Sequence, residues 1–392
     1  MIFNTFAYFF LFLLPAAVLF RVAAAEYRAR VLIASGALFF IYFSVTELGG
    51  WVGALCLTVF FWEAVFSRLY RPGSAWCLAG ILQALLVLFV FKYWNFVVST
   101  VGGSSSSLIW AGAFLPLGVS FFTFEFIHYA RDRQQGTAEK GRLDEYLAFI
   151  LFFPTMVAGP IKRYQDFVPA LRDPSDNWPL DFERGITRIL TGLAKKFVVA
   201  DFMSSFTQNL NATDIAQAER WVLPIWLVAY GIKIYFDFSA YSDIAIGSAR
   251  LFGLRVKENF DWPYARTSIS DFWRHWHMSL SKWLMDYVYI PLGGSRGRSH
   301  FAVYFNLFVT MLVSGVWHGA GLNFVIWGAW HGAALAVNRW WSRRTSNSGR
   351  PASALANFAA WALTMIVVIL GWAWFCMDVP TALFFFRRMI AG

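Results

Sequence analysis

The sequence has few charged residues and very few cysteines. Only 14% of its 392 residues are charged, whereas a soluble domain has about 25%. Cys56, Cys77 and Cys376 lie in or beside apolar runs without the spacing of metal ligands, so we predict core thiols and no disulfide framework. The charge deficit excludes the soluble, disordered and nucleic-acid-binding classes, and it indicates a protein that folds in lipid.

Long apolar runs recur along the whole chain. Hydrophobic residues make up 58% of the sequence and aromatic residues 20%. A helix needs about 20 residues to cross a hydrocarbon core of about 30 Å, so these runs predict membrane spans. We expect the first run to be a retained helix, since it lacks the positive leader and the small-residue cleavage site of a signal peptide. The predicted spans are Ile2 to Phe20, Val31 to Val45, Trp51 to Phe66, Trp76 to Val98, Leu108 to Tyr129, Ile186 to Phe206, Val222 to Phe238, Phe301 to Val316, Leu322 to Val337 and Ala356 to Phe375.

Basic residues alternate between successive loops. Arg21, Arg28 and Arg30 follow the first run, whereas residues 46–50 after the second run contain no Lys or Arg. Because cytoplasmic loops carry the excess of Lys and Arg, this pattern places the N-terminus outside and the basic loops in the cytoplasm. The same rule explains the formal net charge of +10 without a nucleic-acid partner.

Two segments do not fit a simple series of spans. Tyr146 to Ile161 has basic residues on both sides and is interrupted by Pro154 and Gly159, so we expect a re-entrant cytoplasmic hairpin. Ser239 to His300 combines many Lys and Arg residues with amphipathic aromatic stretches, so we expect it to lie on the cytoplasmic face or to dip into the bilayer. No inverted hydropathy repeat divides the chain, and we expect one membrane domain, residues 1–392.

Polar residues inside membrane spans are costly and therefore informative. Asp237 and Asp243 accompany Lys233 in a segment suited to a helix. Two interpretations stay open for them, namely internal ion pairs that join two helices or a polar cavity that binds substrate. Glu125 and His128 lie three residues apart on one helical face, so we predict a local hydrogen bond between them.

Four histidines lie in two motifs. His275 and His277 flank Trp276, but residues two apart on a helix point about 200° apart, and with no third ligand nearby we predict no metal site. His318 stands at a glycine-rich break between two apolar runs, whereas His331 lies within a continuous helical run. A neutral histidine at such a break can accept a proton near neutral pH, so His318 is either a general base or a packed core histidine.

Five sequence blocks, in this order, resemble those of the membrane-bound O-acyltransferase family. The likeness is to its bacterial branch, which contains alginate O-acetyltransferase and the D-alanyl transfer protein of teichoic acids. The blocks are PLGVSFFTFEFIHYARDRQQG from Pro116, FFPTMVAGPIKRYQDF from Phe152, YFDFSAYSDIAIGSARLFG from Tyr235, FWRHWHMSLSKWLMDYVYIPLGG from Phe272 and VWHGAGLNFVIWGAWHG from Val316.

The resemblance implies an all-α polytopic membrane protein. The implied fold is a ring of about ten to eleven transmembrane helices with re-entrant cytoplasmic segments around a central tunnel. The implied activity is transfer of an acyl group, expected to be acetyl, from a cytoplasmic thioester to a hydroxyl of an extracytoplasmic polysaccharide, a cell-wall polymer or a relay protein. The donor is acyl-CoA or an acyl carrier protein, and no cofactor is bound. The implied location is the bacterial inner (cytoplasmic) membrane, with periplasmic acyltransferase-type partner proteins.

The resemblance also assigns site residues. His318 matches the histidine regarded as catalytic, and His277 matches the second motif histidine, while His275 stands where the family usually has arginine. Backbone amides at the break from Gly319 to Gly321, or His277 itself, are expected to stabilise an oxyanion. The residues expected to bind substrate are Arg274, Asp237, Asp243, Trp317 and Asn323.

Three alternatives stay open at this point. Ser279 or Ser281 could carry the acyl group first, although no nucleophile-elbow pattern surrounds them. A channel or transporter for a small metabolite or lipid would also place polar residues inside the membrane. A scaffold for polysaccharide-modifying enzymes would need no catalytic histidine.

Overall fold

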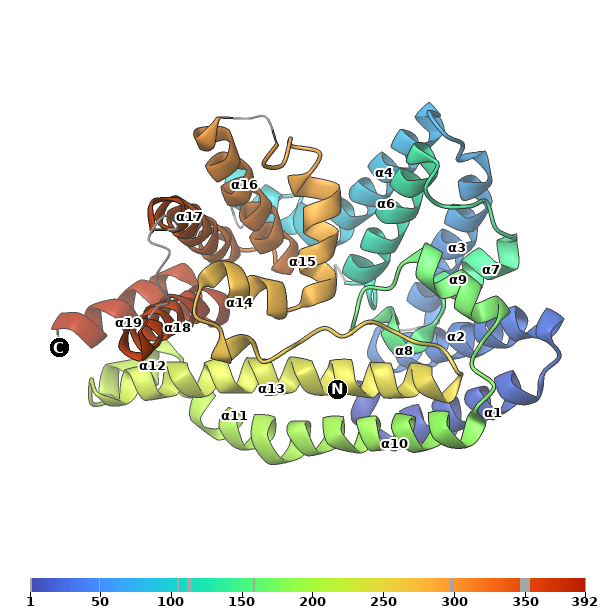
Figure 1. The fold of residues 1–392 in the computed structure, drawn as a ribbon, viewed down its shortest axis with the longest axis horizontal. Coiled ribbons are helices and arrows are strands. Elements are labelled where there is room, and N and C mark those ends of the chain that lie inside the picture. Colours follow the sequence, from blue (N-terminus) through green and yellow to red (C-terminus); the bar gives the residue numbers. More distant parts are fainter. Residues whose placement is uncertain are drawn as a thin grey trace. The chain divides into compact units, whose positions relative to one another are not determined.

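The computed structural model describes residues 2–48, 50–103, 106–110, 115–157, 159–296, 299–345 and 353–391. Every regular element within these residues is a helix (Figure 1). The chain divides into two compact units, which we treat separately. The first unit comprises Met1–Leu193 and Ala240–Glu258, and the second unit comprises Ala194–Ser239 and Asn259–Gly392.

The first unit is built around aromatic side chains. Phe60 and Phe122 meet edge to face with ring centroids 4.5 Å apart, and Phe39 lies 4.8 Å from Phe43. Buried aromatic pairs of this kind stabilise a core beyond their area alone. Its helices are η1 (Ile2–Asn4), η2 (Ala7–Leu13), α1 (Leu14–Val22), α2 (Ala25–Leu48), α3 (Gly50–Phe66), η3 (Ser67–Leu69), α4 (Ala75–Leu88), η4 (Phe89–Tyr93), α5 (Trp94–Gly102), α6 (Val119–Gln135), α7 (Leu143–Ile150), α8 (Phe153–Met156), α9 (Tyr164–Arg172), α10 (Trp178–Ala194) and the C-terminal part of α13 (Val222–Leu251).

The second unit has a tryptophan-rich core and a tight helix pair. Helices α16 and α17 lie side by side (Figure 1), and a Cβ atom on Gly315 would come within 2.3 Å of the Phe324 carbonyl oxygen. Glycine is therefore required for this close approach. The helices are η5 (Lys195–Ala200), α11 (Asp201–Thr207), α12 (Ala212–Gln217), the N-terminal part of α13, η6 (Pro263–Ala265), α14 (Ile269–His275), α15 (Met278–Leu284), η7 (Met285–Tyr289), α16 (His300–His318), α17 (Leu322–Thr345), α18 (Ala354–Cys376) and α19 (Val379–Ala391).

Several helices are long and apolar enough to cross a membrane. Five such segments occur among the described residues, and they identify a multi-pass membrane protein. The arrangement of ten to eleven helices in a ring stays a prediction. The five segments are Ala25–Val45, Ala75–Gly102, Val222–Leu251, His300–His318 and Ala354–Cys376.

Two predicted boundaries are wrong. The run predicted from Leu108 becomes helical only at Val119, because Gly118 precedes it with φ +71°, and part of that run, residues 111–114, lies outside the described residues. The span predicted to end at Phe238 continues as helix, since α13 extends to Leu251. The ion pair that Arg188 makes with Asp243 stabilises this extension.

The interrupted segment Tyr146 to Ile161 comprises most of helix α7 and all of helix α8, which have eight and four residues. Both are too short to cross a bilayer, and most of their side chains are buried. A Cβ atom on Gly36 would lie 1.8 Å from the Leu151 carbonyl oxygen, so α2 packs directly on the end of α7. A short interrupted segment is confirmed, whereas its re-entrant position in the membrane stays a prediction.

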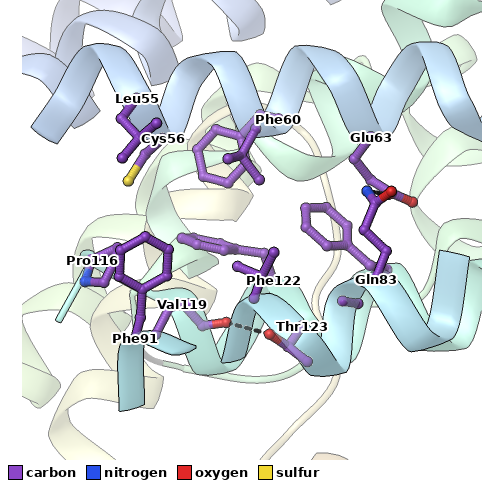
Figure 2. A pocket seen from close by; sticks show the side chains of 14 residues that line it. Leu55, Cys56, Phe60, Glu63, Gln83, Phe91, Pro116, Val119, Phe122 and Thr123 are labelled. Carbon is purple, nitrogen blue, oxygen red and sulfur yellow. Dashed lines mark hydrogen bonds between the residues drawn. The ribbon is translucent and has the colours of Figure 1, made fainter. Parts of the chain in front are cut away.

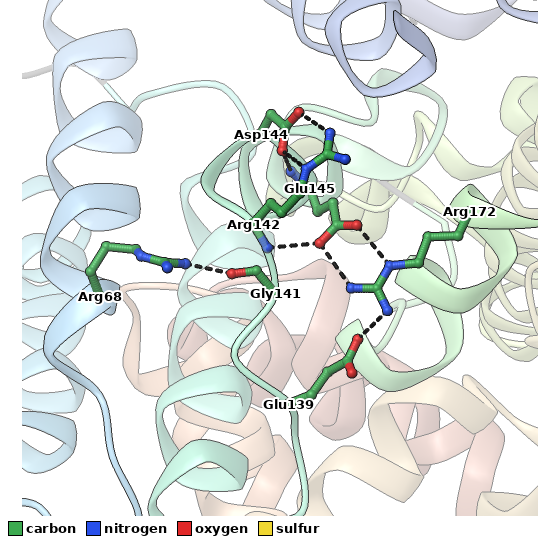
Figure 3. A network of polar contacts seen from close by, with 7 residues as sticks. All are labelled: Arg68, Glu139, Gly141, Arg142, Asp144, Glu145 and Arg172. Carbon is green, nitrogen blue, oxygen red and sulfur yellow. Dashed lines mark hydrogen bonds and ion pairs between the residues drawn. The ribbon is translucent and has the colours of Figure 1, made fainter. Parts of the chain in front are cut away.

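Ion pairs hold the loops around α7 and α9 (Figure 3). Arg172 contacts the carboxylates of Glu145 and Glu139, with nitrogen to oxygen distances of 2.7 and 2.6 Å. Glu145 also accepts a hydrogen bond from the backbone N–H of Arg142 at 2.7 Å. The hydrogen bonds from Arg172 hold the pKa of Glu145 below its ordinary value.

Candidate active site

His277 occupies a strained turn between α14 and α15. Its backbone has φ +44° and ψ +56°, and its side chain is only 2% exposed. A left-handed conformation costs a non-glycine residue about 1–2 kcal/mol. Strain of this kind persists where the surrounding structure holds it, and it is often associated with function.

The imidazole of His277 has a buried nitrogen without a hydrogen-bond partner. Its ring meets Phe238 edge to face at 4.6 Å and lies 6.3 Å from the Trp317 ring. Among the described residues no group hydrogen-bonds to Nε2. Desolvation, and after it the charge of His318, lower the pKa of His277 well below its usual value. The ring is therefore neutral, and its Nε2 makes no hydrogen bond within the described residues.

His318 is the last residue of α16, immediately before the glycine-rich break. Its ring centroid lies 4.8 Å from Trp317 and 5.0 Å from both Trp327 and Phe375. The residue is partly exposed. Because Trp317 contacts the rings of both His277 and His318, the structure brings the two predicted catalytic histidines together.

The break after His318 is closely packed. A Cβ atom on Gly319 would lie 2.1 Å from the ring of Phe324, and one on Gly321 would lie 2.4 Å from Asn323 Oδ1. The amide of Asn323 therefore lies against the break, near the residues predicted to form the site. Glycine at position 319 lets the Phe324 ring pack directly on the backbone.

The predicted substrate-binding residues differ in their surroundings. Arg274 is exposed in the last turn of α14, and it makes no hydrogen bond or ion pair with any residue that the structure describes. Asp237 pairs with Lys196 at 3.0 Å, and Asp243 pairs with Arg188 at 2.6 Å. Both carboxylates thus join two helices, with partners other than Lys233. Their role toward substrate stays a prediction.

Other polar residues of the motifs have structural partners. His275 donates through Nδ1–H to the Asp271 carbonyl oxygen at 2.8 Å. The Ser281 hydroxyl donates to the Trp273 carbonyl at 2.8 Å, and the Ser279 hydroxyl donates to Asn259 Oδ1 at 2.9 Å. The two hydroxyls are thus engaged in holding the turn, which weakens the alternative of a serine-bound acyl group.

The predicted hydrogen bond between Glu125 and His128 is wrong. Glu125 is paired with Lys162, and both side chains are buried. His128 Nε2 accepts a hydrogen bond from the backbone N–H of Tyr164 at 3.3 Å. A buried carboxylate gains more from a cation than from a neutral imidazole, and nothing in the local spacing indicated that Lys162 would supply it.

A separate apolar pocket lies between α3, α4 and α6 of the first unit (Figure 2). Phe60 and Phe122 form its walls, and Glu63 and Gln83 lie at one end. Its lining includes none of the predicted site residues. Within the described residues there is also no group of three or more His, Cys, Asp or Glu side chains that could hold a metal ion.

Sequence reasoning missed Phe238, Phe375 and Asn259. The two phenylalanines form part of the aromatic walls around the histidines, yet they resemble the other phenylalanines of the apolar runs. Asn259 lies eighteen residues before His277, and its hydrogen bonds to the turn could not be inferred from that spacing.

The chain is similar to several bacterial proteins that are named as acyl-transferring enzymes. Probable alginate O-acetylase AlgI of Pseudomonas syringae pv. tomato is 36% identical over 385 residues, which cover 96% of this chain and 72% of that protein. Peptidoglycan O-acetyltransferase of Helicobacter pylori is 30% identical over 383 residues, covering 88% and 70%. Teichoic acid D-alanyltransferase of Bacillus subtilis is 30% identical over 297 residues, covering 70% and 72%.

The model of the membrane-bound O-acyltransferase family matches residues 51–377, a range that includes both histidine motifs. The resemblance in the sequence motifs is thereby confirmed. The chain therefore belongs to the membrane-bound O-acyltransferase family and is an O-acyltransferase.

Proposed function

We propose that this protein transfers an acetyl group from a cytoplasmic thioester to a hydroxyl group of an extracytoplasmic polysaccharide or cell-wall polymer. The observation that carries the proposal is the pair His277 and His318, which both contact the ring of Trp317. The relatives that act on alginate and on peptidoglycan support acetyl as the acyl group and a polymer as the acceptor.

His318 is the general base of the proposed reaction. A sugar hydroxyl is a poor nucleophile at neutral pH, and an imidazole that removes its proton during attack supplies about 10² to 10⁴ in rate. The hydroxyl oxygen forms a bond to the thioester carbonyl carbon while its proton passes to His318. His318 is the last residue of α16, directly before the glycine-rich break, and it is partly exposed.

His277 stabilises the tetrahedral oxyanion that results. With its proton on Nε2, the neutral ring donates a hydrogen bond from a buried nitrogen that has no partner among the described residues. Collapse of the intermediate breaks the carbon–sulfur bond. The proton held by His318 then passes to the thiolate, so ester and free thiol leave the site and the base is regenerated.

The donor is acyl-CoA or an acyl carrier protein that approaches from the cytoplasm. Arg274 suits the phosphate of either donor, because it is exposed and has no ion partner among the described residues. A ring of helices around a tunnel would let the acyl group cross the inner membrane without the whole donor. Periplasmic acyltransferase-type partners and relay proteins are part of this proposal.

The test is acetyl transfer by purified protein in detergent, with radiolabelled acetyl-CoA and with alginate or peptidoglycan fragments as acceptors. We expect wild type to release thiol and to label an acceptor, and His318→Ala to lose at least about 10² in rate. His300→Ala changes the histidine at the opposite end of the same helix and should leave the rate unchanged. Wild-type turnover by His318→Ala would contradict the proposal and would favour a scaffold or a transporter.

Orientation has its own test. In a cysteine-free background, Ser107→Cys and Gln135→Cys place single thiols in two exposed positions of the first unit. We expect an impermeant maleimide added to intact cells to label position 107 and to label position 135 only after permeabilisation. Labelling of both from one side would contradict the proposed topology.

A further inference from the structure

The turn that carries His277 is held from both sides. On the side of α14, the Ser281 hydroxyl donates to the carbonyl oxygens of Trp273 and Trp276, at 2.8 and 3.2 Å. These carbonyls belong to the end of α14, where no helical N–H is left to bond them. Ser281 therefore ties α15 back to the residues that precede His277.

On the other side, the turn is held by Asn259. Its backbone carbonyl accepts from the N–H of Met278 at 2.9 Å. Its Oδ1 accepts from the Ser279 hydroxyl at 2.9 Å and from the Ser279 N–H at 3.3 Å. The two residues that follow His277 are thus both bonded to one asparagine, which is completely buried.

Asn259 supplies an N-terminal cap that His277 cannot supply itself. A helix N-terminus normally receives a capping oxygen from its own first residue, but the side chain of His277 makes no capping hydrogen bond to α15. The Oδ1 of Asn259 satisfies a first-turn N–H instead. The imidazole is left free of this task, with its Nε2 unpartnered.

We propose that Asn259 is a positioning residue that holds His277 in its left-handed conformation and so aims the imidazole at the reacting oxyanion. This inference rests on the proposed function, since it concerns the same site. Asn259 acts only through His277 and touches no substrate. Because a displacement of about 1 Å in a catalytic group can cost about 10² in rate, loss of this support should lower kcat more than it changes the KM for the donor.

The variants are Asn259→Ala, which removes the acceptor, and Asn259→Asp, which keeps an acceptor oxygen for Ser279. Ser279→Ala removes one of the two donors. The matched control is Asn306→Ala, which changes another buried asparagine of the second unit, one that donates to the Gly294 carbonyl at 3.1 Å. Each purified protein is assayed for acetyl-CoA-dependent transfer, with kcat and KM determined separately.

A second measurement does not depend on activity. Diethyl pyrocarbonate modifies accessible imidazoles, and mass spectrometry of peptides locates the modification. In wild type His277 is buried and should be protected, as should His331, which serves as the internal reference. We expect Asn259→Ala to expose His277 at least fivefold more than wild type and to leave His331 protected.

We expect kcat to fall at least tenfold in Asn259→Ala, to fall less in Ser279→Ala and to recover in part in Asn259→Asp, with the donor KM within threefold throughout. If wild type itself transfers no acetyl group, the proposed function fails, while the reactivity of His277 still reports on the turn. If Asn259→Ala does not fold, Ser279→Ala decides the matter by the same two measurements. Unchanged kcat together with unchanged protection of His277, or equal losses in Asn306→Ala, would overturn the inference.

Discussion

A few buried polar groups, taken from the two units, illustrate two different ways of treating such groups. In the first unit, Glu125 is paired with Lys162, and Asp181 lies between Arg21 and Arg250 at 2.9 and 3.0 Å. In the second unit, the buried Nε2 of His277 has no hydrogen-bond partner among the described residues. The buried ion pairs hold neighbouring segments together. The unpartnered nitrogen in the strained turn is instead a candidate for a functional role.

An unpartnered nitrogen is not sufficient to mark a site, as His331 shows. Both of its ring nitrogens lack a partner within the described residues, and its ring packs against Trp273 and Trp327 at 5.0 Å from each. Yet it lies in the regular helix α17, away from any break in the backbone. Backbone strain at His277 and the glycine-rich break after His318 distinguish the two histidines of the proposed site from His331.

The largest loss of stability is expected when the buried ion pair between Lys162 and Glu125 in the first unit is broken. Lys162→Ala leaves Glu125 buried without its cation, which should destabilise the protein by about 3–5 kcal/mol. The matched control is Lys257→Ala, because Lys257 and Asp166 form an exposed pair of the same unit and should contribute less than about 1 kcal/mol. Thermal unfolding in detergent measures both. Equal losses would contradict the view that the buried pair is structural.

In the second unit, removal of the His277 imidazole should lower turnover and leave stability nearly unchanged. His277→Gly suits a residue with φ +44°, so relief of backbone strain offsets lost packing. Loss of an oxyanion donor should lower kcat by about 10² to 10³, while the unfolding temperature stays near that of wild type. A stable variant with wild-type kcat would remove His277 from the mechanism.

His331→Ala should give the reverse result. It removes a buried ring from between indoles, and large-to-small changes of this kind cost about 2 kcal/mol or more. Turnover at 25 °C should stay within threefold of wild type, because the ring makes no contact with His318 that the structure records. Acetyl-CoA turnover and thermal unfolding of the same preparation test this contrast. A hundredfold loss of rate would place His331 in the site.

Structural elements that depend on local composition were predictable from the sequence, whereas contacts between residues far apart in the sequence were not. The apolar runs located the helices, because a membrane span depends on local composition. The glycine-rich break was also a local signal, and it singled out His318 as a candidate site residue. The partner of Glu125 could not be predicted, since Lys162 is 37 residues away and only the fold brings them together. The hydrogen bonds that Asn259 and Ser281 make to the turn around His277 could not be predicted either, because local spacing does not encode them.

The smallest effect on stability is expected from the ion pairs that Arg172 makes in the first unit (Figure 3). Arg172 is 45% exposed, so solvent screens its pairs, and Arg172→Ala should cost less than about 1 kcal/mol at pH 7. Because Arg172 lowers the pKa of Glu145, its contribution is present above the carboxyl pKa of the unfolded chain, about 4.3, and is lost as the pH falls through the lower pKa of the folded state. Unfolding temperatures of wild type and variant should therefore differ slightly at pH 7 and converge as the pH falls below the pKa of Glu145 in the folded state. A difference that grew on acidification would mean that Arg172 acts through something other than this carboxylate.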